Sequence, residues 1–285
     1  MKFAIKILNA VLVVVLTVCI IGIVILKVAS TTILKETYVH KMVEKSKYYD
    51  NLYEEIKSNF ENYIGPSGLD ENILDDICSK QDIQNDTETI LDNIYEGKGE
   101  KINTEEIKSR IIDKINQKVQ EQDNIITEKM QDSIKKFAET IADEYINTIS
   151  HTEYEEQLNS LYKEITKLVE IAQKALFITI AIIVSLLIVL NIKNLYCSAL
   201  SIGIAICSSG AFIIATYYII HSNVKISQLK ILNNAISLAL QNTVTDILSI
   251  TFKIGWILTI IGIILIAVSN TINVVNKDWT VKREI

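Results

Sequence analysis

The first candidates for a functional site are two histidines that have glutamates four residues away. Glu36, His40 and Glu44 follow one another at four-residue steps, so a helix would place them on one face. Imidazole nitrogens and carboxylate oxygens bind transition metals, and this spacing would supply half of such a site. A solvated helix face of alternating charge explains the pattern equally well, and we favour it. The sequence therefore predicts no metal site and no cofactor.

Two further groups receive the same interpretation. His151 and Glu155 repeat the four-residue spacing. An acidic cluster in residues 70–76 lacks the alternating oxygen ligands and the glycine of a calcium loop, so it is interpreted as a solvated helix. Its carboxylates are Asp70, Glu71, Asp75 and Asp76. The sequence contains no GxSxG, HExxH, phosphate-binding loop, paired CxxC or dinucleotide motif. We therefore predict that the protein is not an enzyme and has no catalytic residues.

The elements that carry these residues follow from the distribution of apolar residues. The mean hydropathy is +0.27, although 22% of the residues are charged. The two classes are segregated, because four long stretches, residues 7–26, 175–192, 195–220 and 254–276, carry no charge. A hydrocarbon core needs about 20 apolar helical residues to be spanned. The sequence thus predicts four transmembrane helices. A cleaved signal peptide is the alternative for the first, but its apolar part exceeds the usual length of about 7–15 residues.

The predicted class is all-α: an integral membrane protein with four transmembrane helices and a helical, coiled-coil-like or bundled, extracytoplasmic domain between the first two. Its segments are transmembrane helix 1 (1–30), an acidic helical domain (31–170), transmembrane helix 2 (171–192), transmembrane helix 3 (195–220), an amphipathic outer helix (221–252), transmembrane helix 4 (253–276) and a short cytoplasmic tail (277–285).

The charge distribution predicts a topology. Residues 31–170 contain 17 Lys and Arg against 31 Asp and Glu, a net charge of −14, which argues against nucleic acid as a partner. Lys2, Lys6, Lys193 and the basic tail place both termini in the cytoplasm by the positive-inside rule. Residues 31–170 are then extracytoplasmic, in a multi-pass protein of the cell membrane. The lysines of the second outer loop, including Lys225 and Lys230, count against this orientation.

Helical periodicity also organises the acidic domain. We expect the first span to continue outward as one helix to residue 64. Gly65, Pro66 and Gly68 would then form a fixed turn at the domain tip, because proline lacks an N–H donor and glycine ends helices.

Shorter helices are expected after this turn. They cover residues 71–79 and 80–95, and the second is opened by Ser79 with Asp82 and closed by Gly97. From residue 104 to 174 there is no Gly or Pro, and we expect a break near Ser150. The part before this break would fold back or pair with a second subunit. Its apolar stripe comprises Ile107, Ile111, Ile115, Val119, Ile126, Met130, Ile134, Phe137, Ile141, Tyr145 and Ile149.

The composition of the four predicted transmembrane helices favours helix packing as their role and argues against an ion-coupled transporter. Their interiors lack Asp, Glu, Lys, Arg and His, which secondary transporters usually need at the midplane. Small residues at a period of four let helix backbones approach closely. We predict a helix-packing seam of this kind in the third span, made of Ala199, Gly203, Cys207, Ala211 and Ala215.

Together these features favour a non-enzymatic membrane protein whose acidic outer domain contacts a protein or surface ligand, in sensing or scaffolding. The alternative is a pore-forming or accessory subunit of a membrane transport system. The expected partners are membrane lipid and either another protein or further copies of this chain. Abundant Ile, Asn and Lys suits a bacterial source with an AT-rich genome.

Overall fold

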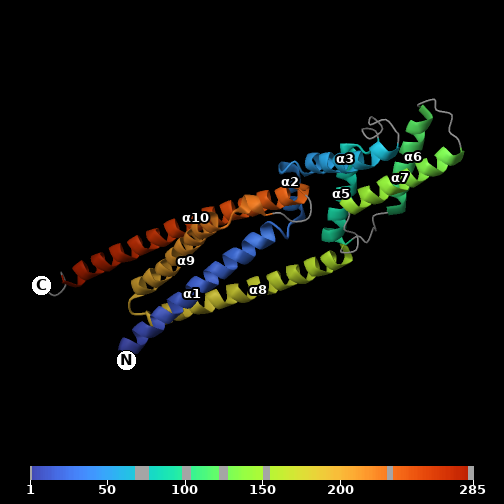
Figure 1. Cartoon of the computed structure of the whole chain (residues 1–285). Coiled ribbons are helices and arrows are strands. Elements are labelled where there is room, and N and C mark those ends of the chain that lie inside the picture. The colour runs from blue at the N-terminus through green and yellow to red at the C-terminus, as the bar shows by residue number, and fades with distance from the viewer. Residues whose placement is uncertain are drawn as a thin grey trace. The chain divides into compact units, whose positions relative to one another are not determined.

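The chain folds into helices grouped in two compact units (Figure 1). The computed structural model describes residues 2–67, 77–97, 104–121, 128–149, 155–229 and 234–281. Within these ranges there is no strand, which confirms the predicted all-α class. We call residues 1–34, 166–228 and 243–285 the apolar unit, and residues 35–165 and 229–242 the charged unit.

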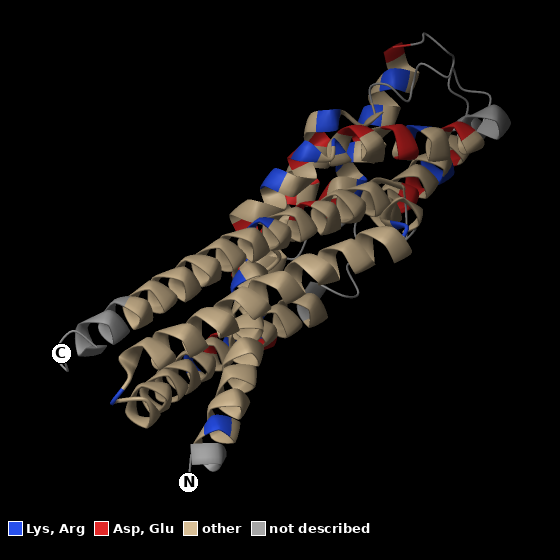
Figure 2. Ribbon diagram, turned by 90° about the vertical axis from the view of Figure 1, so that its left-hand side faces the viewer, with Lys and Arg blue, Asp and Glu red and all other residues tan. Residues whose placement is uncertain are grey.

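The apolar unit is built from four long helices. They are α1 (Lys2–Thr31), α8 (Glu155–Leu190), α9 (Leu195–Asn223) and α10 (Asn234–Val281). All four are long and apolar enough to cross a membrane, as the sequence predicts. Their ribbon is nearly free of charged residues over long stretches (Figure 2). The segment predicted as an amphipathic outer helix is shared: its first residues end α9, a short 3-10 turn η2 (Ile226–Gln228) follows, and residues 234–252 belong to α10.

Polar side chains link α1 to its neighbours inside the apolar unit. The Asn9 amide donates to Ser201 Oγ at 3.0 Å, and Asn191 donates to Asn9 Oδ1 at 3.2 Å. The Ser209 hydroxyl donates to the carbonyl of Thr17 at 3.1 Å. A polar group in hydrocarbon is costly unless it has a hydrogen-bond partner, so these bonds fix which helices meet and in which register.

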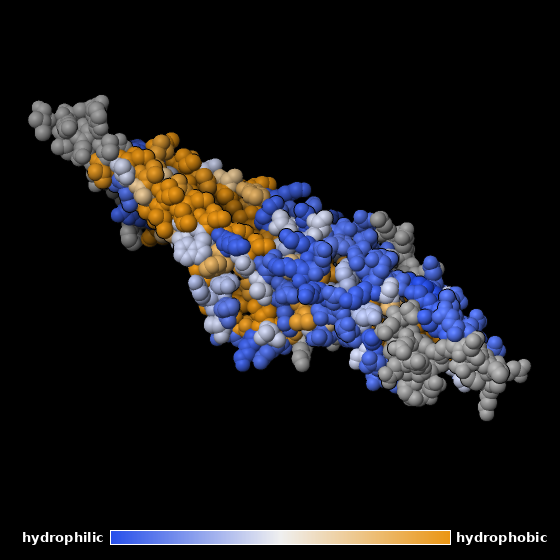
Figure 3. Space-filling view, turned by 90° about the horizontal axis from the view of Figure 1, so that it is seen from above, coloured by the Kyte–Doolittle hydropathy of each residue, from blue (hydrophilic) through white to orange (hydrophobic). Residues whose placement is uncertain are grey.

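The described part of the charged unit contains five further helices. They are α2 (Glu36–Lys45), α3 (Tyr48–Ser67), α5 (Lys80–Glu96), α6 (Thr104–Glu121) and α7 (Glu128–Ile149). Helix α6 packs on α7, and α3 packs on α7, α5 and α2. Figure 3 shows the difference between the two kinds of surface, hydrophilic on the charged unit and hydrophobic on the apolar one. The largest fully buried side chains of the charged unit are Tyr145, Phe60, Leu52, Ile56, Ile77, Ile83, Ile111, Ile115 and Ile141.

The predicted single helix through residue 64 is wrong. Helix α1 ends at Thr31, and α2 and α3 follow as separate helices. The hydroxyls of Thr31 and Thr32 donate to the carbonyls of Lys27 and Val28 at 2.8 and 2.7 Å, which competes with continued backbone pairing. The second break contains Lys47, whose φ of 54° is left-handed and cannot continue a helix.

The apolar stripe predicted over residues 107–149 lies on two helices, α6 and α7, and Ile126 and the side chain of Met130 fall outside the described residues. Ile107, Ile111, Ile115, Ile141 and Tyr145 are each at most 5% exposed. Helix α6 ends at Glu121 and α7 begins at Glu128, so the chain folds back within the stripe. The intervening sequence contains Asp123 and Asn124, which are weak helix formers. The break expected near Ser150 falls within residues 150–154, outside the described residues, and stays a prediction; α7 ends before this segment at Ile149 and α8 begins after it at Glu155.

The turn predicted at the domain tip lies partly outside the described residues. Helix α3 runs through Gly65 and Pro66 and ends at Ser67, slightly later than expected. Gly68, the whole acidic cluster, residues 71–76 of the helix expected over residues 71–79, and His151 fall outside the described ranges. The fixed turn therefore stays a prediction.

Candidate functional site

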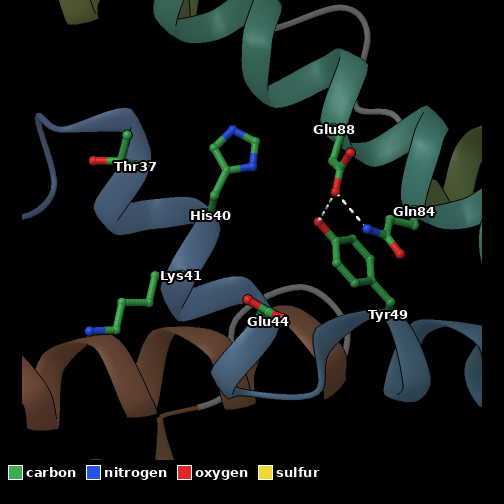
Figure 4. A pocket seen from close by; sticks show the side chains of 7 residues that line it. All are labelled: Thr37, His40, Lys41, Glu44, Tyr49, Gln84 and Glu88. Atoms are coloured by element: carbon green, nitrogen blue, oxygen red, sulfur yellow. Dashed lines mark hydrogen bonds between the residues drawn. The ribbon is translucent and has the colours of Figure 1, made fainter.

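A polar pocket lies among α2, α3 and α5 of the charged unit (Figure 4). Its volume is about 490 Å³. We call it the α2–α5 pocket, and it is lined by Thr37, His40, Lys41, Glu44, Tyr49, Gln84 and Glu88. His40 and Glu44 belong to the four-residue repeat noted in the sequence, and Thr37 and Lys41 lie beside them on α2. The others come from α3 and α5.

Helix α5 is fixed at both ends, which positions its polar face. At its start the Ser79 hydroxyl accepts from the Asp82 amide at 3.1 Å while Asp82 Oδ2 accepts from the Ser79 amide at 3.0 Å, the predicted capping box. At its end Gly97 has the left-handed φ of 65°, as expected for a helix stop. The side chain of Asn159 on α8 also donates to the carbonyls of Asn93 and Ile94.

Two partly buried ion pairs hold α5 against α6, and a hydrogen bond links it to α7. The Arg110 guanidinium forks onto the Asp86 carboxylate, with Nη1 at 3.3 Å from Oδ1, and Tyr145 donates to Asp86 Oδ2 at 2.6 Å. Lys114 Nζ lies 2.7 Å from Asp82 Oδ2. Burial raises the pKa of Tyr145 far above its ordinary value, with further contributions from Cys78 and Asp86, so the phenol stays a neutral donor. These contacts hold α5 in place beside the pocket.

One end of the polar face brings together a histidine and two carboxylates. His40 Nε2 lies 3.8 Å from Glu36 Oε1 on the same helix and 3.4 Å from Asp92 Oδ1 on α5. One ligand atom from each residue lies within 4.8 Å of the other two. The side chains are 29%, 33% and 40% exposed for His40, Glu36 and Asp92, so the cluster is partly shielded yet reachable from solvent. We call it the Glu36–His40–Asp92 cluster.

The other end of the pocket is arranged around Glu88. Gln84 donates to Glu88 Oε1 at 2.8 Å, and the Tyr49 hydroxyl approaches the same oxygen at 3.5 Å (Figure 4). Burial and the nearby Glu88 charge raise the pKa of Tyr49 well above its ordinary value. Tyr49 is therefore a neutral hydrogen-bond donor at physiological pH. The pocket can bind a polar or cationic group through carboxylates whose orientation is already set.

Cys78, the one cysteine outside the predicted spans, lies in the core of the charged unit. It is 4% exposed, and burial raises its pKa to about 12. A thiol in this state is unreactive, because the thiolate is the nucleophile. The other cysteines, Cys19, Cys197 and Cys207, are also free thiols.

The residues of the predicted packing seam divide into two groups. Gly203 and Cys207 face α10: a Cβ on Gly203 would lie 3.1 Å from Ile266 and Leu265 side-chain atoms. Ala199 is half-buried, whereas Ala211 and Ala215 are exposed on this chain. The close approach of α9 to α10 continues instead through Gly210, where a Cβ would lie 2.5 Å from the carbonyl oxygen of Gly255. A period-four pattern drifts around a 3.6-residue helix, so it leaves the seam within two turns.

Comparison with known proteins adds no family. No family model, no curated protein and no solved structure matched the chain.

Sequence reasoning placed Glu36 and His40 on one face but missed their partner. Glu44 lies on the same face two turns away, about 12 Å along the axis from Glu36, so one helix cannot bring all three together. Asp92 on α5 completes the cluster instead. A signal was present, because Gln84, Glu88 and Asp92 also follow at four-residue steps. The spacing of these three residues does not show which other helix the polar face of α5 contacts.

Proposed function

We propose that this is a non-enzymatic, multi-pass membrane protein whose acidic helical domain, residues 31–170, is extracytoplasmic and contacts a protein or surface ligand. The observation that carries the proposal is the α2–α5 pocket. It lies in a unit with its own apolar core, Glu88 is hydrogen-bonded to Gln84 and Tyr49, and the helix that carries Glu88 is capped at both ends. Such a preformed polar cavity is a common form of recognition site. Sensing and scaffolding are both consistent with it.

Aromatic residues support a membrane position for α9. Near one end of this helix Tyr217 and Tyr218 pack on Phe252 of α10, and Phe252 in turn contacts Trp256 on the same helix. Tyr196 lies near the other end, and the 21 residues between Tyr196 and Tyr217 rise about 32 Å. That length matches a hydrocarbon core of about 30 Å, and tyrosine and tryptophan are enriched at both of its interfaces. The lysines at the α8–α9 connection and at the termini then favour a cytoplasmic location for those ends.

The alternative, a pore-forming or accessory transport subunit, has less support. In the described part of the apolar unit, Asn9, Asn191, Ser201 and Ser209 hydrogen-bond to neighbouring helices. Polar groups used in this way stabilise helix packing and are not available to line an aqueous path. A structural role for the spans as an anchor follows.

In-cell photo-cross-linking tests the contact. A photoreactive residue replaces Lys41, which lines the α2–α5 pocket, or Lys135, which is exposed on α7 away from that pocket. We expect a discrete cross-linked species from position 41 that is absent from position 135. Adding Glu88→Ala should remove it, because this change takes away the carboxylate that Gln84 and Tyr49 orient. Equal cross-linking from both positions, unaffected by Glu88→Ala, would exclude the pocket as the contact.

A conductance measurement separates the two functions. Purified protein in planar bilayers should show no channel activity if the apolar unit is an anchor. Reproducible unitary currents that Gly262→Ala abolishes would support the pore.

A further inference from the structure

We propose that the Glu36–His40–Asp92 cluster binds a divalent transition-metal ion, with Zn²⁺ the ion that best fits its chemistry. The inference does not depend on the orientation or the partner proposed above, since three side chains of one unit would hold the ion. It rests on the arrangement of the ligand atoms, on the local charge and on the way the two helices are fixed.

The donor set and its geometry match a zinc site with an open position. One imidazole nitrogen and two carboxylate oxygens are typical ligands, and sites that bind a further molecule use three protein ligands. For metal–ligand bonds of about 2.0–2.1 Å in a tetrahedron, ligand atoms stand ~3.3 Å apart. His40 Nε2 already stands 3.4 Å from Asp92 Oδ1 and 3.8 Å from Glu36 Oε1. The Glu36 and Asp92 oxygens lie within 4.8 Å of each other, and side-chain rotations would bring them to bonding distance of one ion.

The charge of the cluster favours a cation. Two carboxylates flank one imidazole, so the group carries excess negative charge even when His40 is protonated. Among the described residues, His40 is the only basic side chain within 4.0 Å of the Glu36 or Asp92 carboxylate. Glu44 and Glu88 in the adjoining pocket add to the negative potential. A divalent ion would neutralise this charge more fully than the imidazole does.

The ligands come from two helices of the charged unit, α2 and α5. Glu36 and His40 lie one turn apart on α2, and Asp92 lies on the capped helix α5. Because α2 and α5 pack directly, the ion would bridge them and stabilise their contact. His40 also lines the α2–α5 pocket, so an acidic or thiol group of a molecule in that pocket could reach the open coordination position.

Metal titration of the full chain tests the proposal. The protein is purified in mild detergent with a histidine-free affinity tag, stripped with chelator, and titrated with Zn²⁺ by calorimetry and with Co²⁺ by visible absorption. We expect one ion per chain, with Co²⁺ bands of four-coordinate intensity and a rise in melting temperature on Zn²⁺ addition. His40→Ala and Asp92→Asn should each weaken binding at least tenfold and remove the Co²⁺ bands.

Matched variants separate this site from adventitious binding. His221→Ala removes a histidine of the apolar unit, and Asp132→Asn removes an exposed carboxylate of α7, so both should leave the titration unchanged. Glu36→Gln preserves side-chain shape and serves if Asp92→Asn fails to fold by circular dichroism. Absence of a stoichiometric site in the unaltered protein, or equal binding by the folded cluster variants, would show that His40 only forms ion pairs and would overturn the proposal.

Discussion

The backbone of Cys207 lies so close to Gly262 that a Cβ on this glycine would come within 2.6 Å of the Cα of Cys207. This contact is one of the close backbone approaches of α9 and α10 in the apolar unit. Backbone atoms cannot rotate out of the way as a side-chain end can, so the position demands glycine. Lipid tails are as apolar as leucine, and the association of these helices therefore depends on packing of this kind.

Gly262→Ala should destabilise the apolar unit. The added methyl group would force α9 and α10 apart, and overpacking of this kind typically costs about 1–3 kcal/mol. A fall in melting temperature in mild detergent measures the effect. Gly22→Ala is the matched control, because its Cβ would meet only the end of the Leu176 side chain at 3.2 Å. Equal melting temperatures for the two variants would contradict the close backbone approach.

Tyr145→Phe should destabilise the charged unit. It removes the hydroxyl that donates to Asp86, in a side chain that is 0% exposed. A hydrogen bond to a charged group contributes about 1.5–3 kcal/mol, and Arg110 would continue to pair with the carboxylate. Chemical denaturation of the full chain measures the loss. Tyr63→Phe, at a position that is 37% exposed, should have little effect. If both variants unfold at the same denaturant concentration, the Tyr145–Asp86 bond contributes nothing.

Asp82 should make part of the stability depend on acid pH. Burial tends to raise its pKa, but hydrogen bonds from Lys114 and Ser79 outweigh this and lower it below the ordinary value. A carboxyl whose pKa is lower in the folded state stabilises that state above its unfolded pKa of about 3.9, and the contribution disappears as pH falls through the folded pKa. The stability difference between the unaltered chain and Asp82→Asn should therefore be largest near pH 6 and shrink below about pH 4.

The control for this titration is Asp132→Asn. It removes a charge from the exposed surface of α7, and its stability difference should stay small at every pH. Denaturation curves collected between pH 3 and pH 7 provide the comparison. A difference for Asp82→Asn that stays constant through this range would mean that Lys114 and Ser79 do not stabilise the ionised carboxylate.

Labelling with a membrane-impermeant thiol reagent should establish the orientation. Native Cys78 is unsuitable because it is buried, so Cys78→Ala is the parent. Lys135→Cys places a thiol on an exposed position of α7, and Lys193→Cys places one on the exposed connection between α8 and α9. In intact cells we expect labelling above the parent at position 135 and none at 193. Labelling at 193 with protection at 135 would reverse the topology.

The sequence by itself determined the helical class, the four long apolar helices and many of the core positions. Runs of uncharged residues and stripes at three- and four-residue steps are local properties, and the buried faces of α6 and α7 follow them residue by residue. The capping box at Ser79 and the stop at Gly97 were predictable for the same reason, because helix ends are set by the few residues around them. The orientation and the partner remain predictions.

The tertiary structure alone decided where the chain folds back and which helix faces meet. The break after Thr31 was missed because no glycine or proline marks it, and the Thr31 and Thr32 hydroxyls bond to backbone carbonyls there instead. The end of α6 at Glu121 likewise has no glycine or proline beside it. The contact of α9 with α10 runs through Gly203, Cys207 and Gly210. Ala211 and Ala215 lie outside it, because residues four apart drift around a 3.6-residue helix. The Glu36–His40–Asp92 cluster depends on a pairing of α2 with α5 across about fifty residues of sequence. Periodicity shows that each helix has a polar face, and only packing shows which faces become neighbours.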